Sequence, residues 1–382
     1  FKSDDLLSIE DKWYLVRQLR NISLNQLPIL NENGDFFKWL RLPSLEEILY
    51  NIDMFVGGGM YNLHKTANNI DKKTYIHRGL IEEAIASSQL EGAHTTRKAA
   101  KELLFNKRKP NNESEQMIVN NYKTMSAISE SFCKRPLSKD LLFEMHTMLT
   151  ESTLTKSAQN RLRKNTDEIV VQGQMGQDMY ITHVPPTEMF LKDSIDALID
   201  YANDDTKFIH PVIKAVFLHF WIGYLHPFTD GNGRLARGIF YWYLLKKGYE
   251  SFMYVPISTV IKKAPNQYAM AYIQSEQDSL DLTYFLDFHI KKIVQAIDEF
   301  RQYVEEKSSE QKNLDSVINK KYTLNDRQKQ VIQYLVSDTT SSTSAESHTL
   351  LHGISRQTAT RDLRYLEKCN FIKPRRNRSE EH

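Results

Sequence analysis

The sequence predicts a mostly α-helical protein with one β-hairpin and a separate C-terminal helix-turn-helix unit. Apolar residues recur at helical spacing through most of the 382 residues. Residues 165–186 (NTDEIVVQGQMGQDMYITHVPP) place β-branched pairs around a glycine-rich centre, which is typical of a hairpin that ends at Pro185 and Pro186. The polar stretch 316–330 (SVINKKYTLNDRQKQ) is typical of a linker into a further unit.

Composition limits the classes of function. The chain is 41% hydrophobic, as expected of a globular protein with a core. Its net charge of +2 argues against nucleic-acid binding by the molecule as a whole, so any basic site must be local. Cys133 and Cys369 match neither a metal spacing nor a disulfide framework and indicate a reducing compartment. The start of the chain is charged, and the most apolar passage, 215–228, is too short to span a bilayer, so we expect a cytoplasmic protein without membrane contact.

Helical spacing justifies the main elements in chain order. The stretch LIEEAIASSQLEG predicts a helix that stops at Gly92, because glycine readily adopts the left-handed conformation that ends helices. Further helices are predicted within four segments: 112–132, 138–152, 186–204 and 211–225.

The stretch HPFTDGNGRLAR, residues 226–237, carries the strongest functional signal. Pro227 must end the preceding helix, DGNG makes a tight turn, and RLARGIFYWYLLKKG begins a new and buried helix. Backbone N–H groups of such a turn converge at the positive end of a helix, which is an anion site. Arg234 and Arg237 fall on one face of the new helix, and two guanidinium forks beside these donors suit a polyphosphate.

The remaining polar residues of this stretch extend the interpretation. Asp230 would repel phosphate unless a divalent cation lies between them, and Mg²⁺ often takes one protein carboxylate and fills its shell with phosphate and water. His226 can accept a proton from an attacking hydroxyl. The alternative for each residue alone is a tight interhelix turn with a capping aspartate and two surface arginines. For the whole set we favour hydroxyl attack on a nucleotide phosphate.

The same twelve residues match the Fic family signature, His-Pro-Phe-x-Asp-Gly-Asn-Gly-Arg-x-x-Arg, at every fixed position. This resemblance implies a Fic-type helical core with a β-hairpin flap, and an enzyme that transfers AMP from ATP to a Ser, Thr or Tyr hydroxyl of another protein. It implies that His226 is the general base, that Asp230 is the Mg²⁺ ligand, that Arg237 holds the γ-phosphate and that Phe228 is a buried packing residue. It also implies that four residues hold the phosphates, namely Gly231, Asn232, Gly233 and Arg234, and that Thr229 contacts the nucleotide.

Glu91 raises a separate question, because the last turn of a helix disfavours an anion. A solvated surface glutamate is one explanation. The other comes from resemblance: Ser87 to Gly92 are similar to the [Ser/Thr]-x-x-x-Glu-[Gly/Asn] inhibitory helix of one class of Fic proteins. In those relatives the glutamate pairs with the second signature arginine, here Arg237. The likeness implies an enzyme that is autoinhibited in cis.

The predicted hairpin resembles the Fic flap, whose edge could align a target protein by strand addition. This likeness implies that His183 lies near the nucleotide. The alternative interpretation, which the sequence supports equally well, is a surface histidine on a hairpin that only stabilises the fold. Residues 261–272 (IKKAPNQYAMAY) occupy the region where relatives contact adenine. Tyr268 could contact adenine there, but the sequence of this segment departs from the commoner family pattern.

The C-terminal unit resembles a winged helix-turn-helix. Asn325 and Ser355 are expected N-caps of its helices. The expected recognition helix directs one set of residues outward: Arg356, Gln357, Thr358 and Arg361. A second set would point inward: Leu363, Leu366 and Phe371. A basic wing would follow, with Lys373, Arg375, Arg376 and Arg378. The unit could bind DNA, or it could mediate dimerisation or target docking without DNA.

These interpretations divide the chain into four parts: an N-terminal region at 1–125 with the inhibitory helix at about 75–92, a Fic core at 126–305, a linker at 306–322 and the winged helix at 323–382. Two functions remain open. The first is a protein adenylyltransferase that uses ATP and Mg²⁺, which could also modify itself or remove AMP. The second is a DNA-binding regulator whose core senses nucleotide. His226 favours the first, because a sensor needs no base. The sequence leaves open whether the chain forms a homodimer.

Overall fold

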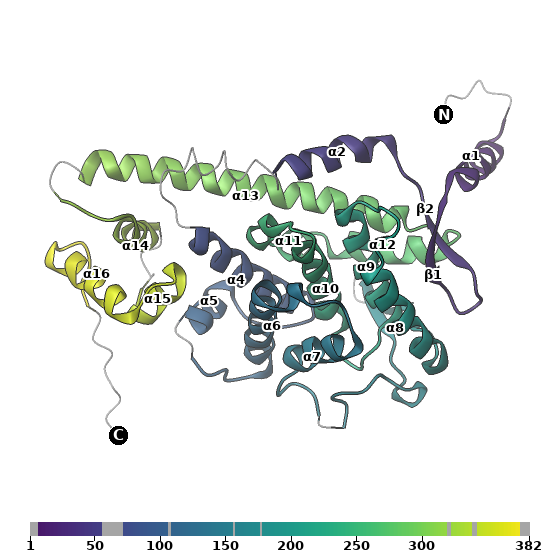
Figure 1. Ribbon diagram of the computed structural model, residues 1–382, viewed down its shortest axis with the longest axis horizontal. Helices are drawn as coiled ribbons and strands as arrows, with labels where there is room; N and C mark the ends of the chain where they lie inside the picture. Colours follow the sequence, from purple (N-terminus) through teal and green to yellow (C-terminus); the bar gives the residue numbers. More distant parts are fainter. Residues whose placement is uncertain are drawn as a thin grey trace.

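The computed structural model describes residues 7–55, 72–105, 108–155, 157–175, 178–318, 322–337 and 342–374. Helices dominate these residues, and the strands among them form two separate antiparallel pairs, β1–β2 and β3–β4 (Figure 1). The predicted mostly helical architecture is confirmed.

Two consecutive buried helices form the centre of the core. They are α9 (Pro211–Leu225), which has proline in its first turn and His210 as its cap, and α10 (Asn232–Lys246). Their side chains are buried on nearly all sides, as expected of helices without a polar stripe. Further helices surround them: α6 (Glu113–Glu130), α7 (Lys139–Leu149), α8 (Glu188–Asn203), α11 (Ile257–Ile261) and α12 (Pro265–Gln277). The helices predicted from spacing are thus confirmed.

The helix α13 (Thr283–Ile318) spans the length of the molecule in Figure 1 and leads from the core to the C-terminal unit. Its first half is buried against the core through residues such as Phe285, Ile293 and Phe300. Residues 306–318, assigned to a linker from their polarity, are the last turns of this helix. The domain boundaries themselves stay predictions. The described residues also include short 3-10 helices: η2 (Phe132–Lys134), η3 (Asn165–Asp167) and η4 (Glu250–Tyr254).

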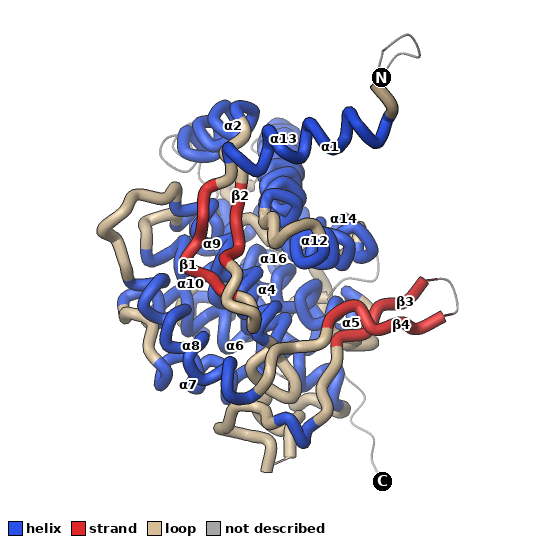
Figure 2. The backbone as a smooth tube through the Cα atoms, turned by 90° about the vertical axis from the view of Figure 1, so that its right-hand side faces the viewer, coloured by secondary structure: helices blue, strands red, loops and turns tan. Residues whose placement is uncertain are grey.

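The N-terminal part contains elements that the sequence analysis did not assign. They are α1 (Ile9–Ser23), β1 (Asn25–Leu30), β2 (Phe36–Trp39), α2 (Pro43–Met54) and α5 (Arg97–Phe105). The helix α4 (Lys72–Leu90) was predicted, and it contains most of the expected inhibitory helix at about 75–92. Figure 2 shows α1 projecting from the body. It is held to the turn before α13 by ion pairs of Arg17 with Asp278 and of Arg20 with Asp281.

The predicted hairpin is present as a strand pair. Strands β3 (Val171–Met175) and β4 (Asp178–His183) run antiparallel, and Figure 2 shows them extending from the helical body. A register shift between Val171 and Gln172 marks a bulge at the end nearest the core. The two prolines after Val184 lie beyond the strand, as predicted.

The C-terminal unit contains α14 (Asp326–Ser337), α15 (Ala345–His352) and α16 (Arg356–Lys368). Both predicted caps are confirmed: Asn325 accepts from the Gln328 N–H and Ser355 from the Thr358 N–H. Leu366 is fully buried, whereas Leu363 and Phe371 are partly buried in the same cluster. The outward set is exposed except for Thr358, which is half-buried, and the start of the wing, Lys373, is also exposed. Arg375, Arg376 and Arg378 lie outside the described residues, so the wing stays a prediction.

A buried carboxylate holds this unit together. Asp362 is 2% exposed and accepts hydrogen bonds from Asn325, Arg327, Gln328 and His348. Each of the three helices or its cap therefore contributes to one polar cluster. The helix α15 also packs against α4 and α5, which joins the unit to the N-terminal part.

Two general properties complete the fold. Within the described ranges, every helix is too short or too polar to cross a bilayer. Cys133 and Cys369 are free thiols, and each is partly exposed.

Candidate active site

The loop between α9 and α10 begins at His226, which caps α9 in the left-handed conformation with φ of 46°. Such a φ is uncommon for a residue with a β-carbon and requires support from its surroundings. Arg163 supplies that support, because its guanidinium donates to the carbonyls of Leu225, His226 and Pro186. Its own N–H donates to the Pro227 carbonyl at 2.9 Å. The catalytic candidate is thus held at a fixed helix end.

Phe228 and Asn232 fix the middle of the loop. The Asn232 side-chain amide exchanges two hydrogen bonds with the Phe228 backbone, at 2.9 and 2.8 Å. Phe228 is fully buried, as predicted, and stacks on His146 with ring centroids 3.7 Å apart. His146 Nε2 donates to the Asp230 carbonyl at 3.0 Å. The amide oxygen and one amide hydrogen of Asn232 are thus used within the loop, and its backbone N–H is left for a phosphate.

The first turn of α10 has the character of an anion site. Gly231 caps it with φ of +84°, a conformation that glycine adopts without strain. The first N–H groups of an α-helix, here of Asn232, Gly233 and Arg234, have no intrahelical acceptor. A β-carbon on Gly233 would lie 2.1 Å from Glu91 Oε1. A carboxylate therefore already lies against the positive end of this helix.

Arg237 is the main partner of that carboxylate. It is 1% exposed and donates from Nη2 to Glu91 Oε1 at 2.9 Å and to the Ser87 carbonyl at 2.9 Å. Its Nε donates to Ser87 Oγ at 2.8 Å. Burial is the largest single influence and lowers the Arg237 pKa, but the Glu91 carboxylate, Tyr268 and Glu83 together outweigh it, so the pKa is raised. Ser87 and Glu91, the first two residues of the predicted inhibitory pattern, therefore both contact Arg237, the second arginine of the signature.

Glu91 lies one residue beyond the end of α4 at Leu90, in a turn that Gly92 completes with φ of +88°. A position inside the last helical turn, as expected from the sequence, is therefore wrong by one residue. Outside the helix its carboxylate can reach the start of α10, so it lies against a positive helix end as well as near a negative one.

The face of α4 that meets the core includes Gly79, Glu83 and Ser87. Gly79 allows close approach, since a β-carbon there would lie 2.0 Å from the Met253 carbonyl. Glu83 is 2% exposed and accepts hydrogen bonds from the Tyr241 hydroxyl, the Ser258 N–H and the Ser258 hydroxyl. Burial raises the pKa of Glu83. These contacts fix α4, and Glu91 with it.

His226 lines a cavity of 630 Å³ together with Glu91, Gly233, His183 and Tyr268. Its Nδ1 lies 3.4 Å from the Gly223 carbonyl, which can only accept a hydrogen bond. The proton of the neutral ring therefore belongs on Nδ1, and the lone pair on Nε2. Burial lowers the His226 pKa to about 4, so the ring is neutral near pH 7 and able to accept a proton.

His183 and Tyr268, also predicted to lie near the nucleotide, line this cavity too. His183 Nδ1 lies 2.8 Å from Glu276 Oε2 and its Nε2 lies 2.7 Å from the Tyr224 carbonyl, so the end of β4 is tied to α12 and α9. Tyr268 lines the cavity, but its hydroxyl points to His219 Nε2 at 2.9 Å. The Tyr268 ring, and not its hydroxyl, is left to face a ligand.

Arg234 and Asp230 form a second ion pair. Arg234 is buried and donates from Nη1 to the Leu149 carbonyl and from Nη2 to Asp230 Oδ2, both at 2.9 Å. The Asp230 side chain is 47% exposed, and Oδ1 is left for another partner. Thr229 Oγ1 is buried and has no hydrogen-bond partner among the described residues.

This arrangement fits Mg²⁺ better than a metal that needs many protein ligands. In the part of the chain that the structure describes, no cluster of three or more histidine, cysteine, aspartate or glutamate side chains could hold a metal. A single, half-exposed carboxylate beside an anion cradle is sufficient for Mg²⁺.

Several supporting residues were missed by the sequence analysis. Arg163, His146 and Glu276 lie in separate segments and reach the loop or hairpin only in the folded chain. Nothing in their local sequence distinguishes them from surface charges or ordinary helix residues. Glu83 had one signal, namely a glutamate within an otherwise apolar and small-residue helix face.

Comparison with known proteins places this site in context. Residues 136–244 match the Fic/DOC family model. Over 68 residues the chain is 38% identical to protein adenylyltransferase Fic of Nematostella vectensis, which covers 18% of this chain and 16% of that protein. It is 22% identical to protein adenylyltransferase fic-1 of Caenorhabditis elegans over 42% of this chain and 28% of that protein. The alignments thus span well under half of these relatives.

Solved structures give a likeness in fold. A Fic family protein from Desulfovibrio desulfuricans has a TM-score of 0.56 at 18% identity, over 87% of this chain and 91% of its own. A Fic-1 variant from C. elegans has a TM-score of 0.51 at 18% identity, over 70% of this chain and 73% of its own. The family match covers the site from α7 through most of α10. The chain therefore contains a Fic/DOC family domain at residues 136–244.

Proposed function

We propose that the chain is a protein adenylyltransferase that transfers AMP from ATP to a Ser, Thr or Tyr hydroxyl of a target protein. One observation carries this proposal. A neutral, buried histidine and the open N-terminus of α10 line the same cavity, and buried Arg237 reaches its edge through Glu91. The relatives named protein adenylyltransferase support the same reaction.

In the proposed reaction the target hydroxyl oxygen attacks the α-phosphorus of ATP. A new oxygen–phosphorus bond forms, the bond between the α-phosphorus and the bridging oxygen breaks, and pyrophosphate leaves with that electron pair. His226 Nε2 accepts the hydroxyl proton, which is the role that its lone pair and low pKa allow. The N–H groups of Asn232, Gly233 and Arg234 bind phosphate oxygens.

Mg²⁺ would be held by Asp230, whose free oxygen adjoins the phosphate cradle. When bound, the ion neutralises phosphate charge and stabilises the leaving pyrophosphate. Arg234 keeps Asp230 in place through their ion pair, and Arg237 would hold the γ-phosphate.

We further propose that Glu91 inhibits this reaction in cis. Its carboxylate lies against Gly233, where a phosphate would bind, and it pairs with Arg237. It therefore fills an anion position and engages the arginine that the γ-phosphate would need. The anchoring of α4 by Glu83 makes this state stable. ATP could then bind with its terminal phosphate displaced, and the α-phosphorus would not be aligned with His226.

The target is proposed to align along the hairpin. Among the described residues β3 and β4 pair only with each other, so each has an outer edge that an extended peptide could join. His183 would fix the hairpin over the cavity through Glu276 and the Tyr224 carbonyl. The ring of Tyr268 would contact adenine.

The experiment is incubation of the purified chain, and of Glu91→Gly, with Mg²⁺ and ATP labelled on the α-phosphate. Covalent label on the chain itself or on lysate proteins supports transfer. Label that follows ATP labelled on the γ-phosphate instead would indicate phosphoryl transfer and contradict the proposal. A matched control is His226→Ala, which removes the base while leaving the phosphate cradle intact.

One observation favours a second candidate, a DNA-binding regulator whose core senses nucleotide. The helix α16 presents Arg356, Gln357 and Arg361 to solvent from a capped N-terminus. If this face reads DNA, binding should weaken steeply with salt, and Arg361→Ala should weaken it further. Absence of gel retardation of genomic fragments at low salt would instead favour a docking role for the unit.

A further inference from the structure

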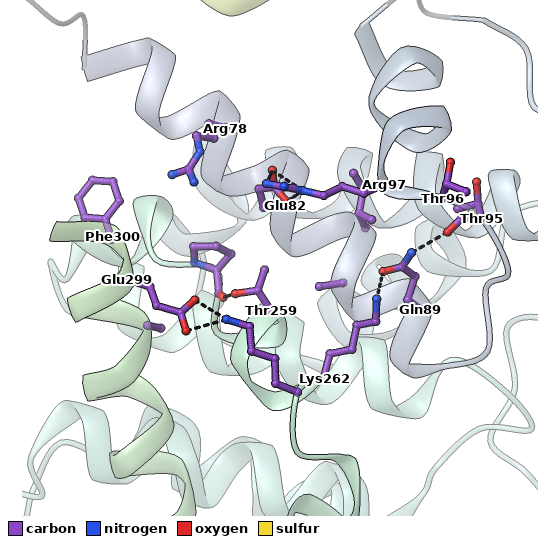
Figure 3. Close-up of a pocket in the computed structure, with 15 residues that line it drawn as sticks. Arg78, Glu82, Gln89, Thr95, Thr96, Arg97, Thr259, Lys262, Glu299 and Phe300 are labelled. Atoms are coloured by element: carbon purple, nitrogen blue, oxygen red, sulfur yellow. Dashed lines mark hydrogen bonds and ion pairs between the residues drawn. The ribbon is translucent and has the colours of Figure 1, made fainter. Parts of the chain in front are cut away.

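A second cavity lies on a different face of α4 from the one that carries Ser87 and Glu91. It measures 670 Å³, and Figure 3 shows the labelled side chains around it, among them Arg78, Glu82, Arg97 and Lys262. The walls are α4, the start of α5, α11 and α13, and the polar residues that matter here are Arg78, Glu82, Gln89, Arg97, Lys262 and Glu299. His226 and Arg237 do not line it. It is thus distinct from the candidate active site.

Positive charge exceeds negative charge in this lining. The charged side chains are Arg78, Arg97, Lys262 and Lys263 against Glu82 and Glu299. Both carboxylates are already neutralised. Glu82 is paired with Arg97 and, at 2.7 Å, with Lys101, while Glu299 is paired with Lys263 at 2.7 Å.

Two cations remain without a carboxylate partner among the residues that the structure describes. Lys262 Nζ donates to the neutral amide oxygen of Gln89 at 2.5 Å. Arg78 lies over the Tyr303 ring, 3.3 Å from its centroid. Arg97 uses Nε and Nη2 on Glu82, and its side chain is 62% exposed, so Nη1 can still donate to a ligand.

The distribution of these groups indicates the kind of ligand. The cations come from α4, from the start of α5 and from the residue that follows α11, so a multivalent anion would engage them better than a single small ion. The volume lies within the range of small-molecule sites, about 300–1,000 Å³. Buried Ile85, Ala296 and Phe300 add an apolar wall that inorganic ions do not need.

We propose that this cavity binds a small organic molecule with two or more phosphate groups. Lys262 and Arg78 would bind the phosphates, with Arg97 as a further donor, and the apolar wall would contact the rest. Gln89, which now accepts from Lys262, is two residues from Glu91. A bound ligand would therefore contact the helix that carries the proposed inhibitor, yet binding itself does not depend on AMP transfer.

Titration calorimetry with inorganic pyrophosphate, without Mg²⁺, tests the proposal on the full chain. The compared variants are Lys262→Ala, Arg78→Ala, Arg237→Ala and Lys139→Ala. The last is a matched loss of one charge on α7, where Lys139 pairs with Asp196 and lines neither cavity. We expect the parent and Lys139→Ala to bind alike, and we expect Arg237→Ala to keep the binding event that Lys262→Ala or Arg78→Ala weakens, because Arg237 does not line this cavity. Loss of either lining cation should raise Kd about tenfold.

Three results would overturn the proposal: no heat with the parent, a parent-like Kd in both lining variants, or loss of binding only in Arg237→Ala, which would assign the anion to the active site. If Lys262→Ala does not fold, as judged by circular dichroism, Lys262→Gln keeps most of the side-chain stem and removes the charge. Failure of AMP transfer alone would leave these binding results unchanged, so the two proposals fail separately.

Discussion

Replacing Glu91 by glutamine removes one negative charge from the contact with Arg237 and keeps the size of the side chain. Arg237 is 1% exposed, so without Glu91 its charge would stay buried with two hydrogen bonds to Ser87 and with Tyr268 and Glu83 nearby. The change should therefore destabilise the chain in the absence of nucleotide and increase its response to ATP.

The magnitude follows from the burial of the pair. Removing one partner of a buried ion pair typically destabilises by about 3–5 kcal/mol. The Glu91 side chain is 27% exposed and Ser87 keeps its hydrogen bonds, so we expect a smaller loss, about 1–3 kcal/mol. Because the unfolding entropy grows with chain length, each kcal/mol should lower the melting temperature of this 382-residue chain by about 1–2 °C. Mg-ATP at about a hundred times its Kd stabilises the folded chain by about 2.7 kcal/mol. In the variant Arg237 is free to contact the γ-phosphate, so ATP should bind more tightly and raise the melting temperature further than in the parent.

The assay is a thermal melt of the parent and of Glu91→Gln, with and without Mg-ATP. Glu144→Gln is the matched control, because Glu144 is paired with Arg135 in a half-exposed bridge and its loss should change stability by less than about 0.5 kcal/mol. Equal melting temperatures and equal ATP shifts for parent and Glu91→Gln would refute the claim that Glu91 satisfies Arg237.

Three further results are expected. Because burial lowers the His226 pKa to about 4, the base stays neutral from pH 8 to pH 6. The transfer rate of the Glu91→Gly chain should therefore be constant over that range and fall as the pH approaches 4. A midpoint of the pH profile near 6.5 would contradict the burial of His226. Asp230→Ala should remove most of the Mg²⁺ dependence of ATP binding in calorimetry, and an unchanged metal effect would exclude Asp230 from the site. Ser258→Ala removes one hydroxyl donor to Glu83, so it should loosen α4 and raise transfer; a variant that is only less stable, with no gain in rate, would show that this contact does not control inhibition.

The sequence was sufficient for the parts of the site that are local in the chain. The turn from His226 to Gly231 and the helix after it follow from proline, glycine and apolar spacing, and the structure forms both where predicted. The hairpin followed from β-branched pairs around glycine. The caps at Asn325 and Ser355 are likewise decided within three residues of each helix start.

Features that depend on tertiary contact could not be read in this way. Polarity suggested a linker at 306–318, but α13 continues there, since its buried first half has already nucleated the helix. The pairing of the Asn232 amide with the Phe228 backbone depends on the folded shape of the loop. The hold of Glu83 on α4 requires Tyr241 and Ser258, which are far away in sequence.

The most direct test of the account is the rate at which label from α-phosphate-labelled ATP becomes covalently attached to protein, compared among the parent, Glu91→Gly and the double variant Glu91→Gly with His226→Ala. The account predicts slow labelling by the parent and much faster labelling by Glu91→Gly. In the double variant it predicts a loss of about 10²–10⁴-fold from the Glu91→Gly rate. Equal labelling by the parent and Glu91→Gly would contradict the inhibitory role of Glu91, and undiminished labelling by the double variant would contradict the chemistry assigned to His226.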